Sequence, residues 1–178
     1  MERIRVHDKE FIPYLSEQTI QDRIAELAKQ ISVDFKDRNV LFLGILNGSF
    51  IFAADLFKRI TIPAAISFIK LVSYKGTSST GTVITSIGLE EDLSGKDVII
   101  VEDIVDTGKT LTEFLPSLVK QNPNSVRICT LLQKPEALQY PLDVDYIGFS
   151  IPNKFVVGYG LDYDGLGRNY AEIFQLAE

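Results

Sequence analysis

Two apolar runs, residues 40–46 and 98–101, constrain the fold most, because each is followed by a turn and then by a segment with helical spacing. A strand that is apolar on both faces is buried on both faces, which is typical of parallel sheets covered by helices. The same patterns predict further strands at residues 64–72, 83–89, 125–132 and 144–151. The sequence therefore predicts an α/β fold with a mainly parallel central sheet flanked by helices.

Apolar residues recur with helical period in three other segments. Ser16 is placed to cap the first helix, residues 50–60 indicate the second, and the third begins near Leu111. The apolar stripe of the first helix consists of Ile20, Ile24, Leu27, Ala28 and Ile31. Residues 73–82 are instead rich in Ser, Thr and Gly, and we predict a mobile surface loop there.

Length and composition narrow the class of protein. A chain of 178 residues fits a single domain, residues 1–178, and its formal charge of −6 makes nucleic acid a poor partner. Cys129 is the only cysteine, so no intramolecular disulfide is expected. No stretch approaches the roughly 18 apolar residues of a membrane span, and residues 1–10 lack the apolar core of a signal peptide. We therefore expect a cytoplasmic protein that binds small ligands and no membrane.

The turns at residues 47–49 and 102–110 are the places to look for chemistry, since α/β sheets bind ligands beyond the carboxyl ends of their strands. Glu102, Asp103 and Asp106 follow a predicted buried strand. Residues 107–110 then open a helix, whose free amides and positive dipole end can bind a phosphate. Carboxylates beside an anion site suit a sugar phosphate, and they can also interact with Mg²⁺. A Walker-type loop is excluded, because it would need glycine at the position of Asp103.

The whole segment of residues 98–110 resembles the phosphoribosyl pyrophosphate signature of the type I phosphoribosyltransferases. Other segments are similar to the hypoxanthine-guanine branch of that family, and the resemblance covers nearly the whole chain. These segments are Leu46-Asn47-Gly48-Ser49, Ser73-Tyr74 with Ser79-Thr80-Gly81, Leu131-Leu132-Gln133-Lys134, residues 145–149 and residues 151–163. The resemblance implies the type I phosphoribosyltransferase fold, with a small hood formed by the chain ends.

The implied reaction belongs to purine salvage. It is the Mg²⁺-dependent transfer of the 5-phosphoribosyl group from phosphoribosyl pyrophosphate to N9 of hypoxanthine, and of guanine, giving IMP or GMP and pyrophosphate. By the same resemblance Asp106 is the catalytic proton acceptor near N7 of the purine, and Glu102 and Asp103 hold the ribose hydroxyls. The 5-phosphate loop consists of Thr107, Gly108, Lys109 and Thr110. From the residues alone, Asp106 is also explained as a helix cap.

The resemblance also assigns the two ends of the substrate. Lys134 donates to the purine 6-oxo group and Phe155 stacks on the base, in a pocket completed by Ile104, Val156, Leu161 and Asp162. Pyrophosphate is bound by Leu46, Asn47, Gly48, Ser49 and Arg168, next to a cis peptide that corresponds to Leu46-Asn47. Mg²⁺ is held by Glu102, Asp103 and Asp162. Ser73 and Tyr74 begin a loop that closes over the sugar.

Simpler explanations of these residues stay open. A lysine at a strand end is usually solvated, Ile104 and Leu161 suit ordinary core packing, and Asp162 and Arg168 suit a surface ion pair. Departures from the family pattern are Asn47 for Lys or Arg, Asn153 for Asp, and two glycines before Arg168.

Rival functions are a xanthine-preferring transferase, a non-enzymatic nucleotide-sensing regulator on the same fold, and a Mg²⁺-dependent nucleotide hydrolase. The regulator requires a basic face for RNA, which the acidic balance disfavours. The hydrolase is disfavoured because no water-activating residue is identifiable. Relatives in the family assemble as homodimers or homotetramers, and we expect the same of this chain.

Overall fold

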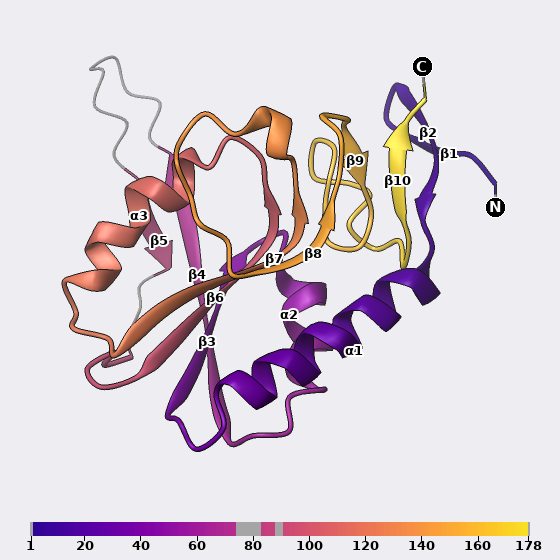
Figure 1. Cartoon of the computed structure of the whole chain (residues 1–178). Coiled ribbons are helices and arrows are strands. Elements are labelled where there is room, and N and C mark those ends of the chain that lie inside the picture. Colours follow the sequence, from indigo (N-terminus) through magenta and orange to yellow (C-terminus); the bar gives the residue numbers. More distant parts are fainter. Residues whose placement is uncertain (1, 74–82, 88–90, 178) are drawn as a thin grey trace, which may run out of the picture.

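The computed structural model describes residues 2–73, 83–87 and 91–177. Its main sheet has six strands in the order β5-β4-β3-β6-β7-β8 (Figure 1). Five are mutually parallel, and β5 is antiparallel to β4. The strands are β3 (Val40–Leu46), β4 (Ala64–Ser73), β5 (Val83–Ile87), β6 (Asp97–Val105), β7 (Ser125–Gln133) and β8 (Tyr146–Ser150). The predicted fold class is confirmed.

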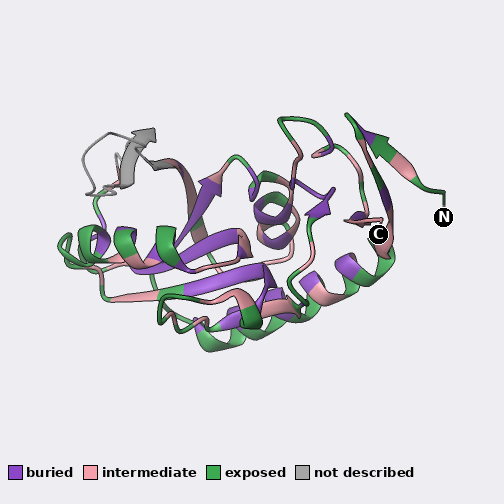
Figure 2. Ribbon diagram, turned by 90° about the horizontal axis from the view of Figure 1, so that it is seen from above, coloured by how far each residue is buried: buried purple, intermediate pink, exposed green. Residues whose placement is uncertain are grey.

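Helices cover both faces of this sheet, as the alternation of core residues along β3 shows. Phe42 packs in one core cluster with residues of α1 (Glu17–Asp34) and α2 (Phe50–Phe57). Leu41 and Leu43 pack in the other cluster with residues of α3 (Lys109–Val119). Because strand residues alternate between faces, both faces of β3 must be apolar. Figure 2 shows the buried central strands between helices whose outer surfaces are exposed.

Helix α1 begins where the sequence predicts, because the Ser16 hydroxyl accepts a hydrogen bond from the amide of Thr19 at 3.2 Å. All five residues of its predicted apolar stripe are buried. Helix α2 ends at Phe57, three residues before the predicted end, and turn hydrogen bonds such as Ile60 N to Phe57 O continue the segment. Within the described ranges, no helix is long and apolar enough to cross a membrane.

A second, antiparallel sheet joins the two ends of the chain (Figure 1). Its order is β1-β2-β10-β9, with β1 (Ile4–Val6), β2 (Lys9–Leu15), β9 (Val156–Val157) and β10 (Ile173–Leu176). It encloses a small core of Val6, Phe11, Val157 and Phe174. This sheet is the predicted hood. A single turn of 3-10 helix, η1 (Pro135–Ala137), follows β7.

The predicted ends of two strands near the site are also corrected. Strand β6 does not end at Val101 but continues to Val105, because Glu102 pairs with Thr130 and Ile104 with Leu132 of β7. Ser73 is the last residue of β4, opposite Val83 of β5, rather than the first residue of a loop. The rest of the predicted loop, including Tyr74, lies outside the described residues.

Candidate active site

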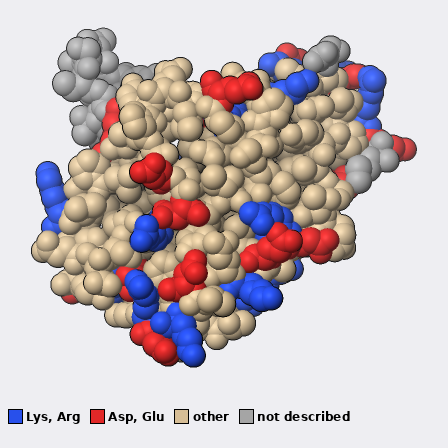
Figure 3. Space-filling model, viewed as in Figure 1, with Lys and Arg blue, Asp and Glu red and all other residues tan. Residues whose placement is uncertain are grey.

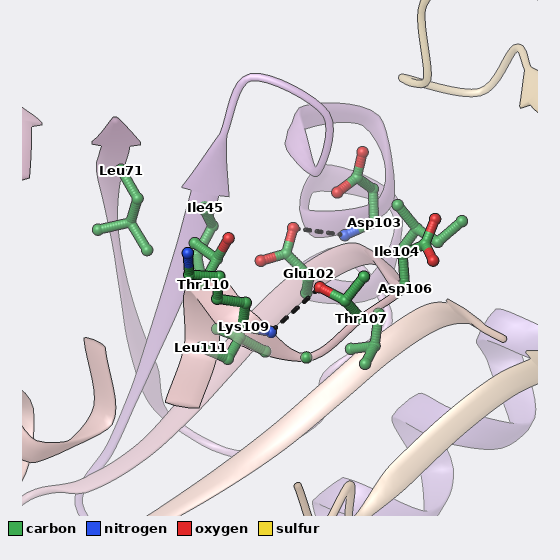
Figure 4. Close-up of a pocket in the computed structure, with 12 residues that line it drawn as sticks. Ile45, Leu71, Glu102, Asp103, Ile104, Asp106, Thr107, Lys109, Thr110 and Leu111 are labelled. Atoms are coloured by element: carbon green, nitrogen blue, oxygen red, sulfur yellow. Dashed lines mark hydrogen bonds between the residues drawn. The ribbon is translucent and has the colours of Figure 1, made fainter. Parts of the chain in front are cut away.

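A hollow of about 260 Å³ lies at the carboxyl ends of β3 and β6. It is lined by twelve residues, ten of which are labelled in Figure 4. They include Glu102, Asp103, Ile104, Asp106 and the whole predicted phosphate loop, residues 107–110. Ile45 and Leu71, which sequence reasoning did not single out, supply an apolar wall. The hollow therefore brings together most of the residues predicted to bind the phosphoribosyl group.

Glu102 and Asp103 are adjacent in β6 but differ in environment. Glu102 is buried, whereas Asp103 is partly exposed. The amide of Asp103 donates to Oε1 of Glu102 at 3.3 Å (Figure 4). Burial, and then the neighbouring charge of Asp103, raise the pKa of Glu102 well above its ordinary value. A ligand that donates hydrogen bonds to this carboxylate would relieve part of the cost of its burial.

The phosphate loop ends at the start of α3. Gly108 has a φ of 80°, which favours glycine, and it precedes the first helical residue, Lys109. The amide of Lys109 donates to the hydroxyl of Thr107 at 3.4 Å, so the loop is closed on itself (Figure 4). Because Gly108 is the N-cap and no side chain caps α3, the alternative reading of Asp106 as the helix cap finds no support.

Asp106 instead forms an ion pair with Lys134, whose Nζ lies 2.9 Å from Oδ2 of Asp106. The Lys134 side chain is only 8% exposed and the Asp106 side chain is 46% exposed. Lys134 is therefore not the solvated strand-end lysine that is usual in proteins. A buried ammonium and an accessible carboxylate stand side by side at the rim of the hollow.

Residues 46–49 turn between β3 and α2, next to the acids. The peptide between Leu46 and Asn47 is cis. Gly48 is so close to Asp103 that an added Cβ would lie 1.6 Å from Oδ2 of Asp103. Ser49 is buried, and its hydroxyl donates to the carbonyl of Ile45 at 2.6 Å. The Ser49 amide also donates to Ile45, at 3.4 Å, so the Ser49 donors serve the turn itself.

The predicted purine residues fall into two groups. Phe155 is 43% exposed, and its ring lies against Phe11 and Tyr163 at 6.2 and 5.7 Å between centroids. Val156 and Leu161 are instead buried in the main core, where ordinary packing is sufficient to explain them. Sequence reasoning missed that the amino-terminal hairpin supports Phe155, because β2 reaches it only through the long-range pairing with β10.

Asp162 and Arg168 form the ion pair that was one of their predicted alternatives, with Nη2 2.7 Å from Oδ1. The other oxygen of Asp162 accepts from the amide of Gly165 at 2.7 Å, and Arg168 also donates to the carbonyl of Gly160 at 2.6 Å. Among the described residues, no three or more His, Cys, Asp or Glu side chains gather closely enough to hold a metal. The predicted metal ligands Glu102, Asp103 and Asp162 thus do not form a closed cage.

Comparison with known proteins defines the class. A family model described as the phosphoribosyl transferase domain matches residues 14–164. The hypoxanthine-guanine phosphoribosyltransferase of Mycobacterium tuberculosis (strain ATCC 25618 / H37Rv) is 43% identical over 166 residues, covering 89% of this chain and 82% of that protein. The chain therefore belongs to the phosphoribosyltransferase family.

Solved structures narrow the group further. A hypoxanthine phosphoribosyltransferase of Staphylococcus aureus has a TM-score of 0.89 at 41% identity, covering 93% of this chain and 91% of that one. The hypoxanthine phosphoribosyl transferase of Trypanosoma cruzi has a TM-score of 0.88 at 34% identity, covering 98% of this chain and 95% of that one. The C-terminal region of that enzyme has a role in its oligomeric state and enzymatic activity. Within its family, the chain is one of the hypoxanthine(-guanine) phosphoribosyltransferases, transferases of purine salvage.

Proposed function

We propose that this site transfers the 5-phosphoribosyl group of phosphoribosyl pyrophosphate to N9 of hypoxanthine and of guanine, with Mg²⁺. The observation that carries the proposal is the hollow in which two adjacent carboxylates, a helix-opening phosphate loop and Asp106 meet, with Lys134 paired to Asp106 at 2.9 Å. Each of these three parts matches one part of the reactants.

The phosphoribosyl group is assigned to the floor of the hollow. The backbone amides of the loop at residues 107–110, at the positive end of the α3 dipole, suit the 5-phosphate. The neighbouring carboxylates of Glu102 and Asp103 suit two vicinal ribose hydroxyls, each of which donates a hydrogen bond. Displacement of pyrophosphate builds positive charge at the anomeric carbon, which nearby carboxylates stabilise.

The purine is assigned to the Asp106–Lys134 pair. O6 and N7 are neighbours on one edge of a 6-oxopurine. A base that reacts through N9 while its proton is on N7 presents O6 as an acceptor and N7–H as a donor side by side. Lys134 can donate to O6 while Asp106 accepts the N7 proton, and their separation of 2.9 Å fits neighbouring atoms. The exposed ring of Phe155 is available to stack on the base.

Pyrophosphate is assigned to residues 46–49 and to Arg168. The chemistry of the donor set fits Mg²⁺, a hard cation that commonly uses one or two carboxylates together with substrate phosphates. Glu102, Asp103 and Asp162 are the carboxylates that would hold it. When bound, the cation neutralises charge on the leaving group. Arg168, which the structure pairs with Asp162, would supply a further positive charge near that group.

The acidic balance favours this enzyme over an RNA-binding regulator. In Figure 3 the visible Lys and Arg side chains of the described residues are interspersed with Asp and Glu. We also propose a cytoplasmic homodimer or homotetramer. The single buried cysteine, Cys129, is compatible with a reducing compartment.

The test is nucleotide formation from phosphoribosyl pyrophosphate with hypoxanthine, guanine, xanthine and adenine, each with Mg²⁺ and with a chelator. We expect IMP and GMP to form only with Mg²⁺, and no product from adenine. A preference for xanthine would correct the assigned bases. If no base yields a nucleotide but the protein still binds nucleotides, the regulator would become the better reading of this site.

A further inference from the structure

A buried tyrosine in the turn after β9 is anchored to the helix that begins after the proposed pyrophosphate loop. The hydroxyl of Tyr159 donates to Oδ2 of Asp55, a residue of α2, 104 positions away in sequence. Tyr159 is 2% exposed and has a left-handed backbone, with a φ of 49°. A non-glycine residue in this conformation is uncommon, so the position of this side chain is closely determined by its surroundings.

Asp55 is the centre of a wider network. Its Oδ2 also accepts from Gln21 of α1 at 2.8 Å, and its Oδ1 lies 2.7 Å from Nζ of Lys58. Arg59 donates to the side-chain oxygen of Gln21 at 2.7 Å and to the backbone carbonyl of Asp55 at 2.9 Å. Burial alone would raise the pKa of Asp55, but hydrogen bonds from Lys58, Tyr159 and Gln21 outweigh it and lower that pKa. The acceptor of the Tyr159 hydroxyl is therefore a fixed carboxylate.

The residue after Tyr159 contacts the loop directly. Gly160 approaches the loop so closely that an added Cβ would lie 2.1 Å from the carbonyl oxygen of Gly48. Gly48 is in turn packed against Asp103, because a Cβ added to Gly48 would overlap the Asp103 carboxylate. The turn after β9, the loop and the ribose-binding acid therefore form one stack of contacts, Gly160 on Gly48 on Asp103.

The stack is held from both sides of the loop. Helix α2, which carries Asp55, begins at Phe50, directly after the loop of residues 46–49. Tyr159 directly precedes Gly160. The Tyr159–Asp55 hydrogen bond therefore connects the residue before Gly160 to the helix that follows Gly48. A displacement of either segment would change the distance between Gly48 and Asp103.

We propose that Tyr159 and Asp55 are positioning residues for pyrophosphate: they hold Gly48 in place beside Asp103 and so support the binding of phosphoribosyl pyrophosphate and of pyrophosphate, but not of the base. The proposal rests on the proposed pyrophosphate role of residues 46–49. Neither residue lines the hollow, so each acts through the loop rather than on the reactants.

The chain contains a matched control. Tyr146 donates to Oδ2 of Asp34 at 2.8 Å, and it is 6% exposed. This pair has the same chemistry and also joins a buried tyrosine to a helix, here α1, but Tyr146 is the first residue of β8. It lies at the amino end of a parallel strand, whereas the site is at the carboxyl ends. Removing either tyrosine hydroxyl should therefore lower the stability of the protein. Only removal of the Tyr159 hydroxyl should weaken the binding of pyrophosphate.

The experiment compares Tyr159→Phe with Tyr146→Phe in the full chain. Calorimetry measures the dissociation constant of pyrophosphate with Mg²⁺, and steady-state kinetics measures KM for phosphoribosyl pyrophosphate and for hypoxanthine. We expect Tyr159→Phe to weaken pyrophosphate binding and raise KM for phosphoribosyl pyrophosphate about tenfold, the scale of one lost hydrogen bond to a charged group. KM for hypoxanthine should change less than about twofold, and Tyr146→Phe should change none of these.

Asp55→Asn supplies the second variant if Tyr159→Phe does not fold. Because the two residues act through one contact, the double variant should be no weaker in pyrophosphate binding than Asp55→Asn alone. Equal effects of Tyr159→Phe and Tyr146→Phe, or an equal rise of KM for hypoxanthine, would overturn the inference. A wild-type protein that neither binds pyrophosphate nor forms IMP would instead overturn the proposed function.

Discussion

Asp106 and Lys134 are neighbours because they directly follow two strands in parallel register: Val105, the last residue of β6, is paired with Gln133, the last residue of β7. The amide of Lys134 also donates to the carbonyl of Val105 at 2.9 Å. The 2.9 Å contact between the two side chains thus follows from the sheet itself rather than from a flexible loop. Groups held by a rigid scaffold are suited to recognise two adjacent atoms of a base.

Replacing Lys134 by Gln should weaken the binding of 6-oxopurines. The amide keeps one donor but loses the charge beside Asp106, so we expect KM for hypoxanthine to rise about tenfold or more. KM for phosphoribosyl pyrophosphate should change much less. Steady-state kinetics with each substrate varied measures this, with the exposed Lys120→Gln as control. An unchanged KM for hypoxanthine would remove Lys134 from the purine site.

Asp106→Asn keeps the shape of the side chain and removes the proton acceptor. We expect kcat to fall by about a hundredfold or more, because general bases typically contribute on that scale. The dissociation constant of IMP, measured by calorimetry, should change far less than kcat. Asp143→Asn, at an exposed position, is the control. If kcat is retained while only ligand binding weakens, Asp106 positions the purine and another group accepts the proton.

The strand that carries the acids shows how far sequence reasoning reaches. The apolar run of residues 98–101 correctly placed a buried strand, but carboxylates are uncommon in strands, so the prediction stopped at Glu102. The strand continues because β7 supplies backbone partners as far as Gln133. Such pairing depends on residues nearly thirty positions away, and local pattern does not contain it.

The site was predictable to a similar degree. The phosphate loop and the three acids all lie within residues 102–110, and the structure brings them into one hollow. Asp55 and Tyr159 could not be predicted to meet, because Asp55 lies in an ordinary helix and its partner is 104 residues away. The only local signal is Gly158-Tyr159-Gly160, in which all three residues have positive φ. Contacts of Phe155 with the amino-terminal hairpin were missed for the same reason.

Glu102→Gln should stabilise the protein at neutral pH while it reduces activity. Burial raises the folded-state pKa of Glu102 above its ordinary value of 4.5, so ionisation costs more in the folded state than in the unfolded state. The wild type therefore loses stability as the pH rises from 4.5 through the folded pKa, and the Gln variant does not. The difference in unfolding free energy, measured by urea titration without Mg²⁺, should be small below pH 4.5 and largest above the folded pKa.

The exposed Glu136→Gln is the control for this pH dependence, and it should give no such rise. Reduced activity in a more stable variant would be the usual exchange between stability and function at an active site. A variant that is less stable than the wild type at pH 7 would mean that hydrogen bonds to the ionised Glu102 outweigh the cost of its burial.

Gly48→Ala tests the contact between the pyrophosphate loop and the ribose-binding acid. The new methyl group would lie 1.6 Å from Oδ2 of Asp103, so this carboxylate must turn away. Because Asp103 is partly exposed, the turn should cost little stability, and we expect a melting temperature close to that of the wild type together with a KM for phosphoribosyl pyrophosphate raised about tenfold or more. Gly95→Ala has no atom within 4 Å of its added Cβ and strains only its own turn, where φ is 71°, so it should leave that KM unchanged. A Gly48→Ala enzyme with normal KM would show that the position of Asp103 does not limit substrate binding.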